Sequence, residues 1–154
     1  MEVARGASIG GVQKFLTFRL GKEEYGLEIL KVQEIIRMMR ITRVPRAPAF
    51  VRGAINLRGK VIPVVDLRVK FGMPDREDGH RACIIVVQIA VDGEMLTTGI
   101  VVNEVCEVTS IRADQIEPAP SLGTGVPTDF IIGLGKVGER VLILLDIDKA
   151  MSST

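Results

Sequence analysis

The chain has 154 residues, and 47% of them are apolar, which is enough for one sizeable domain or two very small ones. Lysine and arginine total 20 against 19 acidic residues, so a net charge of +1 favours neither a nucleic acid nor an anionic membrane as partner. The amino end lacks a secretory signal, and no apolar run approaches the roughly 18 residues of a membrane span. We therefore expect a cytoplasmic protein without direct membrane insertion.

Most of the chain has the pattern of short β-strands rich in valine and isoleucine. Strands are expected at residues 14–20, 23–30, 34–41, 53–57, 60–67, 81–91, 94–102, 107–111, 129–135 and 139–147. The turn signals between them are Gly21-Lys22, Arg58-Gly59, Asp92-Gly93 and Val137-Gly138. Helices are expected to be few and short: Asp66 could cap one, Asp114 lies near the start of a possible turn, and Asp146 could cap a helix at the C-terminus. The sequence predicts a mainly β protein after a flexible tail at residues 1–12.

An internal repeat organises these strands. The spacing of Gly26, Val32, Glu34 and Ile35 recurs in Gly99, Val105, Glu107 and Val108. The spacing from Gly53 to Asp66 recurs from Gly133 to Asp146. We infer two copies of one unit, roughly residues 13–70 and 82–150, each of about five strands that close most easily as a small barrel. Two such small units should pack together, with exchange of strands between them left open.

Few residues suit catalysis or metal binding. His80 is the only histidine, so neither a Ser-His-Asp nor a Cys-His set can form. The acidic run DREDGH at residues 75–80 lacks the spacing of a calcium loop and is predicted to be a solvated turn. Cys83 and Cys106 form no CxxC motif and are interpreted as free thiols. We predict no metal and no cofactor.

The segment GLGKVG at residues 133–138 matches the dinucleotide motif GxGxxG. That motif requires a following helix whose amino end faces the pyrophosphate, whereas ERVLILLD here has the pattern of a strand. We predict a hairpin turn and no enzyme, with a nucleotide enzyme kept as an alternative.

Six arginines lie between residues 37 and 58: Arg37, Arg40, Arg43, Arg46, Arg52 and Arg58. Small barrels that bind single-stranded nucleic acid use aromatic platforms, but this chain has one tyrosine, no tryptophan, and phenylalanines mostly in core-like patterns. A solvated face or a protein-docking surface is therefore favoured over a nucleic-acid site. Single charges among many valines and isoleucines are typical of an adaptor.

Four runs resemble the CheW family, the coupling proteins of bacterial chemotaxis: EEYGLEILKVQEI, PAFVRGAINLRGKVIPVVDLRVKFG, GIVVNEV and FIIGLGKVGERVLILLDIDK. The resemblance covers roughly residues 13–150. It implies two small intertwined five-stranded SH3-like β-barrels that share a core. It also implies an adaptor between the cytoplasmic tips of methyl-accepting chemoreceptors and the regulatory domain of the histidine kinase CheA. We expect a stand-alone coupling protein rather than a CheA-like or CheV-like chain, recruited to receptor arrays at the inner membrane; a non-flagellar array is the alternative.

The resemblance further implies candidate binding residues. Arg58 and Glu34 match polar positions at the family's binding surfaces, with Val32, Asn56 and Gly59 as neighbours. Arginine offers five donors in a rigid fork, which suits a carboxylate or the carbonyls of a helix end. The alternative is an Arg58–Glu34 ion pair that only orders the turn.

A second set of candidates is apolar. Ile100, Val102, Val105 and Val108 are candidates for a receptor groove, in which a helical hairpin would lay its apolar stripe. The alternative is that they belong to the core, because strands bury one face anyway. The segment RMMRITRVPRAP at residues 37–48 is more basic than the family leads us to expect, which bears on the class of receptor preferred.

Overall fold

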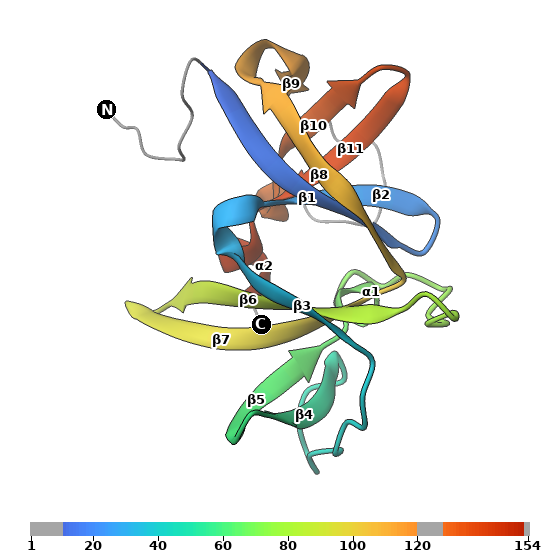
Figure 1. Cartoon of the computed structure of the whole chain (residues 1–154), viewed down its shortest axis with the longest axis vertical. Helices are drawn as coiled ribbons and strands as arrows, with labels where there is room; N and C mark the ends of the chain where they lie inside the picture. Colours follow the sequence, from blue (N-terminus) through green and yellow to red (C-terminus); the bar gives the residue numbers. More distant parts are fainter. Residues whose placement is uncertain (1–10, 120–127, 153–154) are drawn as a thin grey trace.

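The computed structural model describes residues 11–119 and 128–152, and within them the strands form two sheets (Figure 1). The strands are β1 (Val12–Leu20), β2 (Glu23–Glu28), β3 (Val32–Arg37), β4 (Val51–Leu57), β5 (Lys60–Val65), β6 (Cys83–Val91), β7 (Glu94–Val102), β8 (Glu104–Arg112), β9 (Ile116–Glu117), β10 (Ile131–Val137) and β11 (Arg140–Leu145). The helices are η1 (Ile29–Lys31), α1 (Leu67–Lys70), η2 (Ala113–Gln115), η3 (Thr128–Phe130) and α2 (Ile147–Ser152). Sheet A has the order β8-β1-β2-β11-β10-β9, and sheet B has the order β3-β6-β7-β5-β4.

Each sheet contains strands from both sequence repeats. Strands β1 and β2 belong to sheet A with β8 to β11, while β6 and β7 belong to sheet B with β3 to β5. The predicted mainly β, intertwined fold is confirmed. The predicted halves 13–70 and 82–150 correspond to the two sequence repeats, but neither half forms a sheet by itself. Val12 already pairs with Arg112, so β1 begins inside the predicted tail, whose residues 1–10 lie outside the described residues.

The repeat glycines lie where the exchanged strands meet. Gly26 on β2 pairs with Leu144 of β11, and Gly99 on β7 pairs with Val64 of β5, both in parallel register. A Cβ atom at Gly26 would lie 2.9 Å from a methyl carbon of Leu144, and one at Gly99 would lie 2.8 Å from a methyl carbon of Ile84. Glycine therefore permits the close approach of strands on which the exchange depends.

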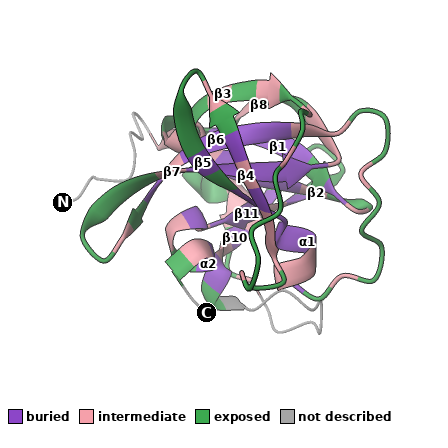
Figure 2. Ribbon diagram, turned by 90° about the horizontal axis from the view of Figure 1, so that it is seen from below, coloured by how far each residue is buried: buried purple, intermediate pink, exposed green. Residues whose placement is uncertain are grey.

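A shared apolar core joins the two sheets. It includes Phe18 and Leu27 from sheet A and Val87 and Ile100 from sheet B, all fully buried. Figure 2 shows buried stretches on strands of both sheets, among them β1 and β6. Smaller clusters lie within each sheet, around Ile84 in sheet B and Leu142 in sheet A. The phenylalanines expected in the core are buried there: Phe15, Phe18, Phe71 and Phe130. Burial of one such side chain contributes about 2 kcal/mol, so the shared cluster is a major force holding one sheet on the other.

Turns and caps agree with most local predictions. The turns at Gly21-Lys22, Arg58-Gly59 and Asp92-Gly93 form as predicted. The β10–β11 turn lies at residues 138–139 instead of 137–138, because Val137 still pairs with Arg140. GLGKVG was predicted to be a hairpin turn, but its residues 133–137 belong to strand β10 and only Gly138 lies in the turn.

Both predicted helix caps form, whereas the bounds of two predicted strands are wrong. Asp66 accepts a hydrogen bond from the amide of Arg68 at 3.0 Å, and Asp146 accepts one from the amide of Lys149 at 3.2 Å, so both caps are confirmed. The strand predicted to residue 41 ends at Arg37, and β8 extends beyond the predicted 107–111 at both ends. Within the described residues, no helix is long and apolar enough to cross a membrane.

Candidate functional site

The Arg58 side chain is presented by a tight hairpin turn between β4 and β5. Arg58 has a φ of 52° and Gly59 has a φ of 87°, and the amide of Gly59 donates to Oδ1 of Asn56 at 2.8 Å. The Arg58 guanidinium donates to the carboxylate of Glu34 on β3. Strands β3 and β4 are the opposite edges of sheet B, so this ion pair joins the two edges of the curled sheet.

The pair is ordered yet open to a partner. The Arg58 side chain is 65% exposed and that of Glu34 is 28% exposed. The hydrogen bond from Arg58 lowers the pKa of Glu34, so the carboxylate is charged at neutral pH. Among the described residues, Glu34 is the only hydrogen-bond partner of the Arg58 guanidinium. The internal ion pair is confirmed, while binding through the remaining N–H groups stays a prediction.

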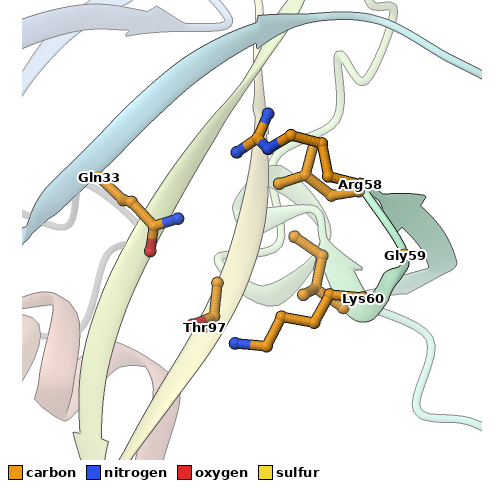
Figure 3. Close-up of a pocket in the computed structure, with 7 residues that line it drawn as sticks. Gln33, Arg58, Gly59, Lys60 and Thr97 are labelled. Carbon is orange, nitrogen blue, oxygen red and sulfur yellow. The ribbon is translucent and has the colours of Figure 1, made fainter.

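A hollow of about 240 Å³ lies between this turn and β3. Figure 3 shows the side chains of Arg58 and Lys60 on one side of the hollow and Gln33 on the other. Thr97 of β7 lies between the two sides. Gln88 orders that side, since its amide donates to Gln33 at 2.5 Å and to the Thr97 hydroxyl at 2.9 Å. Gln33, Lys60, Gln88 and Thr97 were not predicted from the sequence as parts of a site. Hairpin register could have located Lys60, but Thr97 reaches the hollow only through the order of strands in sheet B.

The apolar candidates divide into buried and accessible residues. Ile100 and Val102 are 0% exposed and belong to the shared core, so their predicted place in a receptor groove is wrong. They lie on β7, an inner strand of sheet B. Val32 and Val105 are half-buried against the shared core. Val108 on β8 is 53% exposed and remains a candidate.

A buried polar cluster joins Arg52 and Arg68 to the connector between the repeats, which is the segment between α1 and β6. The Arg68 side chain is 0% exposed, and its guanidinium donates to Asp66 twice at 2.9 Å and to Asp78 at 2.7 Å. Arg52 donates to Asp78 at 2.9 Å and 3.1 Å and to Asp66 at 3.2 Å. Asp78 belongs to the run DREDGH, so the prediction of a merely solvated turn is wrong for this residue.

Asn103 extends the cluster to both sheets. Its side-chain oxygen accepts from the amide of Gly21 in the β1–β2 turn and from Arg68, and its amide group donates to the carbonyls of Glu77 and Asp78. Hydrogen bonds from Arg52, with those from Arg68, lower the pKa of Asp78 to about 2. The cluster therefore carries fixed charges at neutral pH and anchors the connector.

Comparison with known proteins decides the family. Residues 14–154 match the CheW-like domain. The chain belongs to the CheW family. It is 44% identical over 148 residues to the chemotaxis protein CheW of Klebsiella aerogenes, covering 96% of this chain and 86% of that protein. It is 32% identical over 142 residues to the chemotaxis protein CheW of Treponema pallidum, with 91% and 82% covered.

A solved structure supports the same assignment. The crystal structure of the scaffolding protein TtCheW from Thermoanaerobacter tengcongensis matches with a TM-score of 0.81 and 35% identity, over 92% of this chain and 94% of that one. The family inferred from the sequence is confirmed. The names of these relatives place the CheW family in chemotaxis, and the crystallised member is described as a scaffold.

Proposed function

We propose that the chain is a non-catalytic scaffold of chemotaxis signal transduction. It connects the cytoplasmic tips of methyl-accepting chemoreceptors to the regulatory domain of the histidine kinase CheA. Its family and the scaffolding role named for its crystallised relative support this proposal. The structural observation that carries it is the exposed Arg58 fork, which a hairpin and Glu34 hold at the rim of a hollow.

The hairpin site is suited to recognition rather than chemistry. The turn is closed by Asn56 and the guanidinium is positioned by Glu34, so little conformational freedom is lost on binding. An arginine fork can bind a partner carboxylate or the carbonyls at a helix end, while the hollow beside it accepts a side chain. Charge at this rim fixes the register of the partner and disfavours wrong ones.

A second surface would allow two partners to bind at once. Val108 and the half-buried Val105 lie on β8 of sheet A, whereas Arg58 lies on sheet B. An apolar stripe of a receptor helix would pack against these valines. The shared core makes the two sheets one rigid mount, so the adaptor can pass a conformational bias from receptor to kinase without a reacting group.

Co-sedimentation with a receptor signalling fragment and the kinase tests the hairpin site. Arg58→Glu and Glu34→Lys should each weaken assembly by about tenfold or more, because each reverses a charge at the rim. The double variant, Arg58→Glu with Glu34→Lys, restores an internal ion pair but moves the positive charge from the turn to β3. Recovery of assembly in the double variant would mean that the pair only orders the turn.

Arg76→Glu is the matched control, because this exposed arginine lies in the connector between α1 and β6, outside both the hairpin site and β8. It should assemble like the parent. If both single hairpin variants assemble and activate the kinase like the parent, the assignment of the site is wrong. A Val108→Glu variant that still assembles with the receptor would remove the second surface.

The nucleic-acid alternative finds no support in the aromatic residues. The four phenylalanines predicted to be core and Tyr25 are buried, so none of these five offers a stacking face to a base. We therefore propose only the scaffold.

A further inference from the structure

The segment between β3 and β4 is held tightly against an edge of sheet B. The amide of Thr42 donates to the carbonyl of Ala54 at 2.9 Å, and the amide of Ala54 donates back at 2.8 Å. Gly53 makes this approach possible, since a Cβ atom there would lie 2.1 Å from the carbonyl oxygen of Thr42. Met38 and Ile41 pack on the inner cluster of sheet B. The segment is thus anchored on both sides of Met39.

The rest of the segment is shaped by turns. The amide of Val51 donates to the carbonyl of Pro48 at 2.9 Å, and that of Ala47 donates to the carbonyl of Val44 at 3.4 Å. Pro45 and Pro48 each fix one backbone angle. The surface of this segment is therefore formed in advance, which lowers the entropic cost of binding.

Two adjoining hollows lie along the segment. One has a volume of about 430 Å³ and is lined by Met38, Met39, Ile41, Arg43, Ala49, Val51 and Arg52. The other, of about 300 Å³, shares Arg43 and Arg52 and continues past Val44 and Arg46. Met39 is 39% exposed and Val44 is 48% exposed. Methionine adapts its shape to different apolar partners, so the hollows suit an inserted apolar side chain.

Four exposed arginines of this segment have no acidic partner among the described residues, and two of them, Arg43 and Arg46, line the hollows. Across residues 11–119 and 128–152, no ion pair involves Arg37, Arg40, Arg43 or Arg46. Other arginines do pair with carboxylates in the described structure: Arg19, Arg52, Arg58, Arg68, Arg81, Arg112 and Arg140. Four like charges that lack internal compensation attract an anionic partner.

The second repeat shows that the fold does not require these arginines. Glu117 pairs with Leu134 in β10 as Thr42 pairs with Ala54, and a Cβ atom at Gly133 would lie 2.7 Å from the carbonyl oxygen of Glu117. In sequence, residues 116–130 contain no lysine or arginine and two acidic residues. In sequence, the stretch after Thr42 thus carries Arg43, Arg46 and Arg52, whereas the stretch after Glu117 in the second repeat carries no basic residue, so the repeated unit itself does not require them.

We propose that residues 37–52, here called the arginine–methionine surface, dock an acidic amphipathic segment of a further protein partner. An apolar side chain of that segment enters the methionine-lined hollow, and its carboxylates bind Arg43 and Arg46 at the rim. The surface begins at the end of β4 opposite Arg58. Arg58 lies six positions after Arg52, roughly 20 Å along an extended chain, so both sites can be occupied together.

The shape and surroundings favour a protein over a membrane or a nucleic acid. A hollow receives a protruding side chain, whereas insertion into a bilayer requires apolar groups that protrude from the protein. The aromatic ring within the segment, Phe50, has the Lys70 ammonium 4.1 Å from its centroid, so that face is covered and cannot stack on a base.

A helical peptide of about 16 residues is the probe, with leucine at i, i+3, i+4 and i+7 and glutamate elsewhere. Its affinity is measured by titration calorimetry, and the contact is mapped by amide chemical shifts. The native chain should bind it through residues 37–52. Arg43→Glu combined with Arg46→Glu should weaken binding at least about tenfold. Met39→Ser should weaken it less, and replacing leucine by serine in the peptide should abolish it.

The matched control is Arg76→Glu combined with Arg112→Glu, which changes the net charge equally but lies outside the surface. Thermal unfolding checks that each variant is folded. The proposal is overturned if the control loses as much affinity as the double variant, or if the double variant binds like the parent. It is also overturned if phosphatidylserine vesicles or a single-stranded oligonucleotide bind the surface more tightly than the peptide does. Because receptor and kinase are absent from this assay, its result does not depend on the proposed function.

Discussion

Replacement of Arg68 by methionine should lower the free energy of unfolding by about 3 kcal/mol. Methionine nearly fills the volume of the side chain, so the main effect is electrostatic. Asp66 is 2% exposed and would lose two hydrogen bonds from Arg68. Breaking a buried ion pair from one side costs about 3–5 kcal/mol, and the contact of Arg52 with Asp66 offsets part of this cost. The loss is a large share of the 5–15 kcal/mol that stabilises a typical domain.

Urea unfolding at pH 7, followed by circular dichroism, measures this loss. Arg52→Met is the control, because its side chain is 32% exposed and Asp78 keeps Arg68 as a partner, so we expect about 1 kcal/mol. Adding Asp66→Asn to Arg68→Met should recover part of the stability, because the carboxylate left without Arg68 becomes a neutral amide. A loss below about 1 kcal/mol for Arg68→Met, or a larger loss for Arg52→Met, would refute the buried-cluster argument.

Three further predictions concern stability. Because the pKa of Asp78 is lowered to about 2, its contribution of about 1 kcal/mol is present above pH 4 and is lost as the pH falls from about 4 to about 2. The stability difference between the parent and Asp78→Asn should shrink over that range in acid-titrated urea unfolding; a constant difference would contradict it. Gly53→Ala should lower the free energy of unfolding by about 2 kcal/mol or more, because its Cβ atom would collide with the carbonyl oxygen of Thr42. Gly59→Ala should lower it by about 1 kcal/mol, because a Cβ atom there meets open space. Equal losses in thermal unfolding would show that the backbone at Thr42 moves away at little cost. Ile100→Ala should lower the free energy of unfolding by about 3 kcal/mol and Val108→Ala by under about 0.5 kcal/mol, because Ile100 is buried and Val108 is exposed. The reverse order in urea unfolding would contradict the burial of Ile100.

Local features of the fold could be predicted from the sequence because neighbouring residues decide them. Asp66 and Asp146 cap their helices through amides two or three residues away, and the hairpin at Arg58 follows from a charged residue beside Gly59. The repeat of Gly26 and Gly99 marked two copies of one unit. It could not show that these glycines contact strands of the other copy, since that contact is set by tertiary packing.

The candidate site was predicted only in part, for the same reason. The Arg58–Glu34 pair was foreseen as an alternative through the family resemblance, although 24 residues separate the two in sequence. Ile100 and Val108 were both candidates for the groove with the core as the alternative, and the sequence could not separate them, because β7 lies inside its sheet whereas β8 lies at an edge. Asp78 looked solvated because its neighbours are polar, yet two arginines from elsewhere in the chain surround it.

The exchange of strands has a consequence for how the chain can come apart. A protease cut in the connector at residues 72–82 would break the covalent link between the two repeats. Strand β2 would still be paired with β11, and β7 with β5. The fragments would stay together as a noncovalent pair, and neither could leave without opening both sheets. Synthesis of either repeat alone would produce a chain with unpartnered strand edges, prone to aggregate until its other half is supplied.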